Sequence, residues 1–166
     1  KECIFSVECQ LVNITGQIEG TFFLYEEEIC FRGEQKYISF SLSSITMILY
    51  RSYLHFEYGL EFFLTNQKSH FLFFKKGIKE KILQLLRNSP NQYLKQGLKL
   101  WNSKEFLNIQ TEKWRNGVIS NYEYLMYLNL LSGRSFNDLS QYPVFPWILT
   151  NYKSETLDLD DESNYR

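Results

Sequence analysis

The sequence predicts a mainly β fold with added helices: an antiparallel β-sandwich or barrel of about seven strands, closed by one helix and followed by a mostly helical segment. Three observations support this prediction. Short aromatic and β-branched runs, separated by turn residues, fill the first 75 residues. One amphipathic helix pattern comes next. Beyond about residue 110 the composition changes to helical patterns with clear start and stop signals.

The strands are recognised by their period of two. Ile38, Phe40 and Leu42 are separated by serines, as in a strand with one buried face. The expected strands are Ser6–Thr15, Glu19–Tyr25, Ile29–Arg32, Lys36–Ser41, Ile45–Tyr50, Gly59–Leu64 and Ser69–Phe74. The expected turns are Gly16–Gly20, Glu26–Glu28, Arg32–Gln35, His55–Gly59 and Thr65–Lys68. Such short, evenly spaced strands are typical of sandwiches and barrels.

A helix is expected at Ile78–Arg87, where apolar residues recur at helical spacing. This apolar stripe comprises Ile78, Ile82, Leu85 and Leu86. The helix would close one open end of the sheet and bury the stripe. Asn88–Gln110 is expected to connect this part to the next, and a short helix could start within it at Ser103.

A second helix is expected at Asn121–Ser132. Ser120 and Glu123 have the spacing of a capping box, and Gly133 supplies the stop. Of the ten residues Tyr122–Leu131, eight are apolar or aromatic and they lie on every side of the helix. A helix of this kind is buried all round. We therefore expect the first domain, or protein beyond this segment, to cover it.

Composition limits the classes of protein to consider. The chain has 166 residues, of which 44% are hydrophobic and 17% aromatic, so a packed core is expected rather than disorder. A net charge of −1 gives no indication of nucleic-acid binding. The longest uncharged runs have 14 residues, whereas a membrane span needs about 20. The chain begins at Lys1 rather than Met, so we expect a segment of a longer protein.

No catalytic, cofactor-binding or metal-binding residues are expected. The cysteines are Cys3, Cys9 and Cys30, an odd number that favours a reducing compartment, although a Cys9–Cys30 bridge between neighbouring strands stays open. His55 and His70 have no Cys or acidic partner at ligand spacing, and His70 is expected to be a packed strand residue. Ser120 is better explained as a helix cap than as a nucleophile.

Two sets of residues resemble a known family. Downstream, the matching residues are Trp114, Ile119–Met126, Leu128–Asn129, Gly133–Leu139, Gln141–Leu149 and Ser154–Leu159. They resemble the start of a BEACH domain, as found in neurobeachin, the lysosomal trafficking regulator and their relatives. Upstream, the matching residues are Glu8–Val12, Gly20, Ile29–Phe31, Arg51–Tyr53, Gly59–Phe63 and Phe71–Phe74. They are similar to the pleckstrin-homology (PH)-like domain that precedes BEACH in that family.

The resemblance implies a PH-like domain at residues 1–88, a linker at 89–110 and the truncated N-terminal segment of a BEACH domain at 111–166. It implies a non-catalytic, cytoplasmic scaffold in vesicle and membrane traffic, lysosome-related organelles and autophagy. The PH-like domain would dock on BEACH and leave a groove between them. The expected partners are the rest of the BEACH domain and an unknown protein or peptide, with no nucleic acid. Peripheral association with endomembranes and dimerisation through exposed apolar surface are further expectations.

Several residues are expected at the interface between the PH-like domain, BEACH and a partner. They are Arg51, Tyr53, Trp114, Asn121, Tyr122, Tyr124, Leu125, Leu128, Arg134 and Trp147. Arg and Tyr are frequent at interface hot spots, although an ordinary loop after a strand remains the alternative for Arg51 and Tyr53. Tyr142–Leu149 is expected to pack inside BEACH, and Ser154–Tyr165 to be a solvated loop or a frayed end.

The alternative function is weak membrane-lipid binding, to phosphoinositide or to other anionic lipid. Lys75, Lys76 and Lys79 form the core of the basic cluster and would supply the lipid contact. The competing interpretation of these lysines is an ordinary solvated rim. Specific phosphoinositide binding is disfavoured because Ser6–Tyr25 contains no Lys or Arg, whereas a multiply charged headgroup needs several cationic donors.

Overall fold

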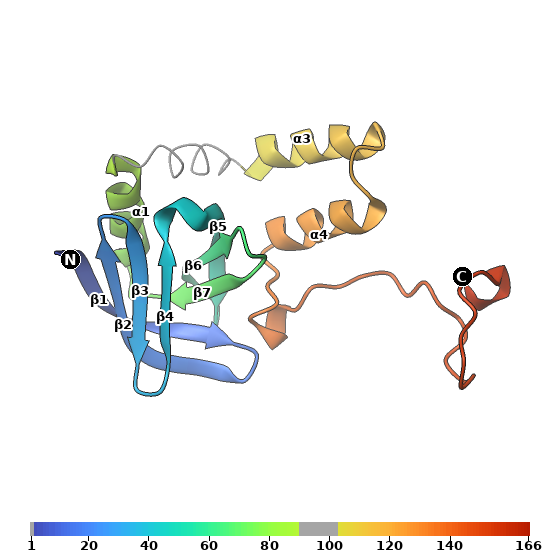
Figure 1. Ribbon diagram of the computed structural model, residues 1–166, viewed down its shortest axis with the longest axis horizontal. Coiled ribbons are helices and arrows are strands. Elements are labelled where there is room, and N and C mark those ends of the chain that lie inside the picture. Colours follow the sequence, from blue (N-terminus) through green and yellow to red (C-terminus); the bar gives the residue numbers. More distant parts are fainter. Residues whose placement is uncertain (1, 90–102) are drawn as a thin grey trace.

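The computed structural model describes residues 2–89 and 103–166 and places seven strands in one antiparallel sheet (Figure 1). The strands are β1 Cys3–Asn13, β2 Gly16–Tyr25, β3 Glu28–Gly33, β4 Tyr37–Ser41, β5 Ile45–Tyr53, β6 Phe56–Leu64 and β7 Ser69–Phe73. Their order in the sheet is β4-β3-β2-β1-β7-β6-β5. The predicted mainly β, PH-like fold with added helices is confirmed.

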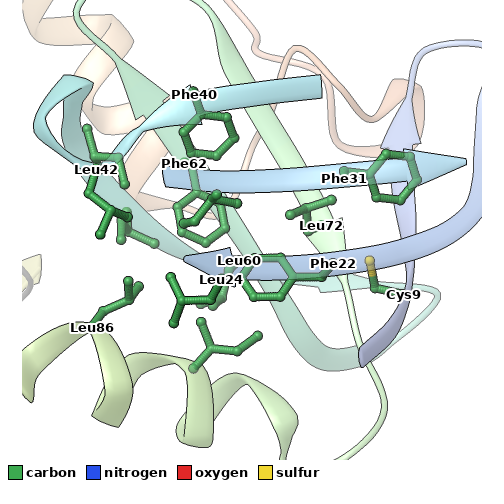
Figure 2. Close-up of a cluster of buried hydrophobic side chains, with 14 of the residues drawn as sticks. Cys9, Phe22, Leu24, Phe31, Phe40, Leu42, Leu60, Phe62, Leu72 and Leu86 are labelled. Carbon is green, nitrogen blue, oxygen red and sulfur yellow. The ribbon is translucent and has the colours of Figure 1, made fainter. Parts of the chain in front are cut away.

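The sheet bends so that strands from both of its ends contribute to one core (Figure 2). Phe22 and Phe31 come from the first half of the sheet, Leu60 and Phe62 from the second half, and all four are at most 1% exposed. Burying such side chains contributes most of the folding free energy, at roughly 1.5–3 kcal/mol each.

Within residues 2–89 and 103–166, three α-helices accompany the sheet: α1 Ile78–Asn88, α3 Ser103–Arg115 and α4 Asn121–Leu131. Short 3-10 turns lie at Leu42–Ser44, Leu139–Gln141 and Glu162–Asn164. Helix α1 packs on the core through Ile82, Leu83 and Leu86, so the predicted closing helix is present. No helix in residues 2–89 or 103–166 is long and apolar enough to cross a membrane.

Two expected turns are wrong, and in both a glycine was the misleading residue. Strand β2 already begins at Gly16, and β6 at Phe56. A Cβ on Gly20 would lie 2.5 Å from the carbonyl oxygen of Arg32, and one on Gly59 would lie 2.5 Å from the Phe71 ring. Both glycines therefore allow close approach within the sheet and do not form turns.

The turn between β5 and β6 is formed by Leu54 and His55, which have positive φ angles of 48° and 70°. Left-handed backbone is unfavourable for bulky residues, so neither residue signals a turn in the sequence. Strand β1 also differs from its expected range, because it begins at Cys3 and ends at Asn13 before a turn at Ile14–Thr15.

Helices α3 and α4 form a hairpin beside the sheet (Figure 1). Trp114 and Tyr124 stack with their ring centroids 4.7 Å apart, and the Tyr124 hydroxyl lies 3.0 Å from Thr111 Oγ1. Helix α3 begins at Ser103, as the sequence allowed, and it runs across the expected boundary between residues 110 and 111. Residues 90–102, most of the expected linker, lie outside the described residues.

Helix α4 has its predicted capping box: Ser120 Oγ accepts from the Glu123 amide, and the Glu123 carboxylate accepts from the Ser120 amide. The described residues cover α4 only in part, and the expectation that protein beyond this segment covers the rest stays a prediction. Tyr122 is 60% exposed and Leu128 is 36% exposed, whereas Leu130 is buried. Helix α3 packs against α4, and the last turn of α4 contacts the sheet through the hydrogen bond from Arg51 to the Leu130 carbonyl.

The chain after α4 is extended and mostly exposed in the described residues, and the expected packing of Tyr142–Leu149 inside a BEACH domain stays a prediction. Val144 is 60% exposed and Trp147 is 69% exposed. Three side chains contact this segment. Asn129 Nδ2 donates to the Val144 carbonyl, and Asn129 Oδ1 accepts from the Val144 amide, both at 2.8 Å. Arg134 Nη1 donates to the Tyr142 carbonyl at 3.0 Å, and the Tyr122 ring stacks on Phe145.

The acidic stretch Ser154–Tyr165 is solvated but not frayed. Leu149 and Tyr165 form an antiparallel bridge, and the Arg166 amide donates to the Ile148 carbonyl at 2.8 Å. The segment is therefore a closed loop. Its acidic side chains face water, as expected.

The cysteines are all free, so the open alternative of a Cys9–Cys30 bridge is wrong. Cys9 and Cys30 are buried, whereas Cys3 is exposed. Burial raises the pKa of the Cys9 thiol to about 12.

Candidate functional site

An ion pair on the second half of the sheet forms the centre of the candidate site. Arg51 lies near the end of β5, just before an irregularity in its pairing with β6, and Glu61 lies in the middle of β6. Arg51 Nε and Glu61 Oε2 are 2.5 Å apart, and both side chains are 1% exposed. Hydrogen bonds to the other atoms of a buried pair offset its desolvation cost. Among the described residues, Arg51 Nη2 is the buried atom of this pair that has no hydrogen-bond partner.

The second oxygen of Glu61 has three donors. Glu61 Oε1 accepts from Ser69 Oγ at 2.7 Å, from Ser135 Oγ at 2.8 Å and from Asn137 Nδ2 at 2.8 Å. Ser135 and Asn137 belong to the segment after α4, more than 70 residues away in the chain. Hydrogen bonds to a buried carboxylate are among the stronger ones in proteins. Glu61 therefore fixes this segment against the sheet.

Arg51 makes the matching contact to helix α4. Its Nη1 donates to the Leu130 carbonyl at 2.9 Å and to the Tyr50 carbonyl at 3.3 Å. Leu130 lies in the last turn of α4, where carbonyl groups lack partners in the helix and the helix dipole favours a cation. We call the set Arg51, Glu61, Ser69, Leu130, Ser135 and Asn137 the polar junction.

The loop that supplies Ser135 and Asn137 is held by its own hydrogen bonds. The Ser135 amide donates to the Gln141 carbonyl at 2.9 Å, and the Asn137 amide donates to Ser135 Oγ at 3.0 Å. Asp138 Oδ1 accepts from the Ser140 amide at 2.9 Å and caps the short turn at Leu139–Gln141. The loop therefore presents its side chains to Glu61 in a fixed conformation.

The structure brings one of the expected interface residues, Arg51, into the polar junction. Tyr53 packs instead against the rings of Phe71 and Phe73 on the sheet. Trp114, Asn121 and Tyr124 lie in the α3–α4 hairpin, where Trp114 Nε1 donates to Asn121 Oδ1 at 2.8 Å. The remaining expected residues lie along α4 and the chain after it, and they are Tyr122, Leu125, Leu128, Arg134 and Trp147.

Sequence reasoning missed Glu61, Ser135 and Asn137 as site residues. Glu61 had one available signal, because it is the lone acid in the otherwise apolar run Leu60–Leu64 and shares a strand face with Phe63. Ser135 and Asn137 look like ordinary loop residues. Their partner is remote in the chain and only the fold shows it.

The lysines proposed for lipid contact do not form one basic pocket. Lys75 is exposed and lies 3.1 Å from the Glu8 carboxylate. The Lys79 side chain is only 14% exposed, lies over the Tyr50 ring and donates to the Glu57 carbonyl. Within residues 2–89 and 103–166, no group of His, Cys, Asp and Glu is arranged to hold a metal ion.

Comparison with known proteins shows that the polar junction connects two parts of the chain that match different family models. Residues 9–87 match the family model described as the PH domain associated with Beige/BEACH, and residues 112–166 match the Beige/BEACH domain. The chain belongs to the PH–BEACH family. Arg51, Glu61 and Ser69 lie in the PH-like part, whereas Leu130, Ser135 and Asn137 lie in the BEACH part.

Relatives of this PH–BEACH chain are much longer. The lysosomal-trafficking regulator of Drosophila melanogaster is 32% identical over 99% of this chain and 5% of its own length. A putative neurobeachin homolog of Caenorhabditis elegans is 39% identical over 80% of this chain and 6% of its own length. The chain thus spans about a twentieth of these curated relatives.

One solved structure with similarity to the chain contains the linker and DH/PH domains of p115-RhoGEF. It has 13% sequence identity and a TM-score of 0.38, over 49% of this chain and 26% of that one.

Proposed function

We propose that this chain is a non-catalytic protein-interaction module of a BEACH protein that acts in membrane traffic. In this proposal the PH-like part is docked on the BEACH part through the polar junction, and the joined unit presents apolar surface to further protein. The module works on the cytoplasmic side of membranes, and its ligands are the surfaces of other proteins.

The observation that supports this most is the burial of Arg51 and Glu61 between segments far apart in the chain. Both charges lie in the PH-like part, and they bond to the BEACH part through Leu130, Ser135 and Asn137. Without the BEACH part, Glu61 Oε1 would keep only Ser69 among these three donors. A carboxylate in this position therefore favours permanent docking of the two parts.

The exposed apolar surface of the BEACH part supports the second half of the proposal. Tyr122 and Leu128 on α4, and Val144, Trp147 and Ile148 after it, are 36–69% exposed. Several large exposed apolar residues in one part of a chain are a reason to expect a protein interface. We infer that further protein, beginning with additional BEACH sequence, covers them.

Co-purification tests this proposal. The tagged chain would be co-expressed with the region that follows the matched BEACH segment in the C. elegans neurobeachin homolog. We expect a stable complex, and we expect Leu128→Lys combined with Trp147→Lys to abolish it. Ile14→Lys, a similar change at a residue 53% exposed in the turn between β1 and β2, is the control and should retain binding. Equal binding by the double variant and the wild type would contradict the proposal.

A further inference from the structure

A groove of about 620 Å³ lies on the sheet where β1 and β7 separate. The two strands pair only at Gln10–Val12 of β1, and β7 ends at Phe73, whereas β1 extends back to Cys3. The groove is therefore at the end of β7 that is remote from the β6–β7 turn. Its lining includes Glu8, Gln10, Glu19, Thr21, Phe73 and Lys75, none of which belongs to the polar junction.

An aromatic strip leads out of the groove onto the hairpin of β5 and β6. Phe73 stacks on Tyr58 with ring centroids 6.2 Å apart, and Tyr58 stacks on Phe56 at 5.5 Å. Tyr53 supports Phe73 from the side, edge to face at 5.5 Å. Phe56 is 55% exposed, and Tyr58 and Phe73 are half-buried. We call Phe56, Tyr58 and Phe73 the aromatic strip; the faces of such rings attract cations.

Carboxylates stand beside this strip. Glu8 and Glu19 are both exposed, and with Lys75 they give the groove two negative charges against one positive charge. Gln10 Nε2 donates to Glu19 Oε1 at 2.6 Å and holds that carboxylate in place. Within residues 2–89 and 103–166, Glu19 forms no ion pair. Burial is the main cause of the raised pKa of Cys9 in the groove, and the charge of Glu19 adds to it.

The one cation in the groove can be displaced. Lys75 lies 3.1 Å from the Glu8 carboxylate, but the two side chains are 77% and 79% exposed. An ion pair in such contact with water contributes little to stability, because water and salt screen it. A cation supplied by a partner could therefore take the place of Lys75 at Glu8.

We propose that this groove binds an arginine side chain of an extended segment of another protein. The guanidinium plane would lie on the Phe73 ring while its N–H groups donate to Glu19 and Glu8. An apolar neighbour in the same segment would cover Tyr58 and Phe56. The proposal rests on the proposed role of the chain as a protein-interaction module, and it places a second partner surface on the sheet.

Charge complementarity selects this class of partner. The carboxylates of Glu8 and Glu19 repel phosphate, which disfavours both an anionic membrane and a nucleic acid at this surface. The aromatic strip adds apolar area that a free metal ion or a small amine would leave uncovered. A peptide that combines arginine with apolar side chains satisfies both features.

Peptide binding to the full chain tests the site. The probe is a fluorescein-labelled peptide in which arginine alternates with valine, and its counterpart carries citrulline, which has a similar shape but no charge. We expect saturable binding of the arginine peptide by fluorescence anisotropy, with amide NMR shifts at Gln10, Glu19 and Phe73. The citrulline peptide should bind at least roughly tenfold more weakly, because it loses the attraction to both carboxylates.

Two variants locate the binding. Glu8→Gln combined with Glu19→Gln should weaken it roughly tenfold. Phe73→Leu keeps an apolar side chain in the sheet and should weaken it roughly threefold through loss of the ring. Glu26→Gln combined with Glu27→Gln removes the same charge from exposed positions in the turn between β2 and β3, and should leave binding unchanged.

Three results would overturn the proposal: no saturable binding, equal binding of the citrulline peptide, or equal loss in the Glu26 and Glu27 control. Self-association of the chain that Phe73→Leu abolishes would also overturn it, since a second copy would then be the occupant. Light scattering measures this. The co-purification test depends on Leu128 and Trp147, outside this groove, so the two proposals fail independently.

Discussion

Arg51 Nε lies 2.5 Å from Glu61 Oε2, and this pair is buried although neither side chain belongs to the hydrophobic core of the sheet. The BEACH part covers it by adding Leu130, Ser135 and Asn137. The BEACH part thus supplies hydrogen bonds to a polar pair on the PH-like part, although buried Arg51 Nη2 has no hydrogen-bond partner among the described residues. Four experiments follow from this arrangement and from the environments of single residues.

The first prediction concerns the ion pair. Glu61→Ala leaves the buried Arg51 without its counter-charge, so we expect it to lower the free energy of unfolding by about 3–5 kcal/mol. Arg51→Met combined with Glu61→Leu replaces both charges by apolar groups and should cost less than Glu61→Ala alone. Urea unfolding measures both changes. A loss below about 1 kcal/mol for Glu61→Ala would show that the pair contributes as little as a surface ion pair.

The second prediction compares two leucines of α4. Leu128 is 36% exposed and Leu130 is 7% exposed. Leu128→Lys should change the free energy of unfolding by less than about 0.5 kcal/mol and reduce self-association of the chain. Leu130→Lys should destabilise the fold by several kcal/mol because it buries an ammonium group. Urea unfolding and light scattering at two protein concentrations separate the effects, and equal destabilisation by both variants would be inconsistent with this orientation of α4.

The third prediction concerns pH and His70. Burial lowers the pKa of His70 below the ordinary 6.5, so the unfolded chain takes up the proton more readily than the folded chain. Its contribution to stability is therefore complete above pH 6.5 and is lost as the pH falls through the folded-state pKa. His70→Phe keeps an aromatic ring against Phe40 and should flatten this part of the stability profile. An unchanged profile in thermal unfolding between about pH 7 and 5 would refute it.

The fourth prediction concerns thiol reactivity. At pH 8, a thiol reagent should modify Cys3 quickly, whereas Cys9 should react only on unfolding because its pKa is about 12 and the thiolate is the reactive form. Cys30 is buried and should also react slowly. Counting modified thiols over time by mass spectrometry measures this. In Cys3→Ser, fast labelling should disappear; its persistence would mean that an interior cysteine is accessible.

Much of the fold could be predicted because local signals agree with tertiary packing. The alternation around Ile38 and Phe40 marks β4, and Ser120 with Glu123 marks the start of α4. Gly20 and Gly59 misled the prediction because their small size serves strand contacts. The strand pattern assigns Glu61 to the face of β6 that points away from the core. The alternation of apolar and polar residues predicts that this face is exposed to solvent.

The exposure of α4 could not be predicted. The hydrophobicity of a helix indicates that it needs to be buried, but it does not identify the residues that cover it. Arg51 was singled out from residue type and family resemblance, and the structure supplies its partners. Ser135 and Asn137 form the other half of that site through contacts more than 70 residues distant. No local pattern contains such information.

Asn129 has a consequence for the chain that follows α4. Its carboxamide offers one donor and one acceptor to Val144, which is the same pair of bonds that a residue in an adjacent strand would offer. A side chain on a helix thereby replaces a missing strand neighbour. These two bonds contribute to the alignment of the Pro143–Pro146 stretch, together with the stacking of Phe145 on Tyr122. A shift that placed Pro143 opposite Asn129 Oδ1 would remove the donor, because proline has no amide hydrogen.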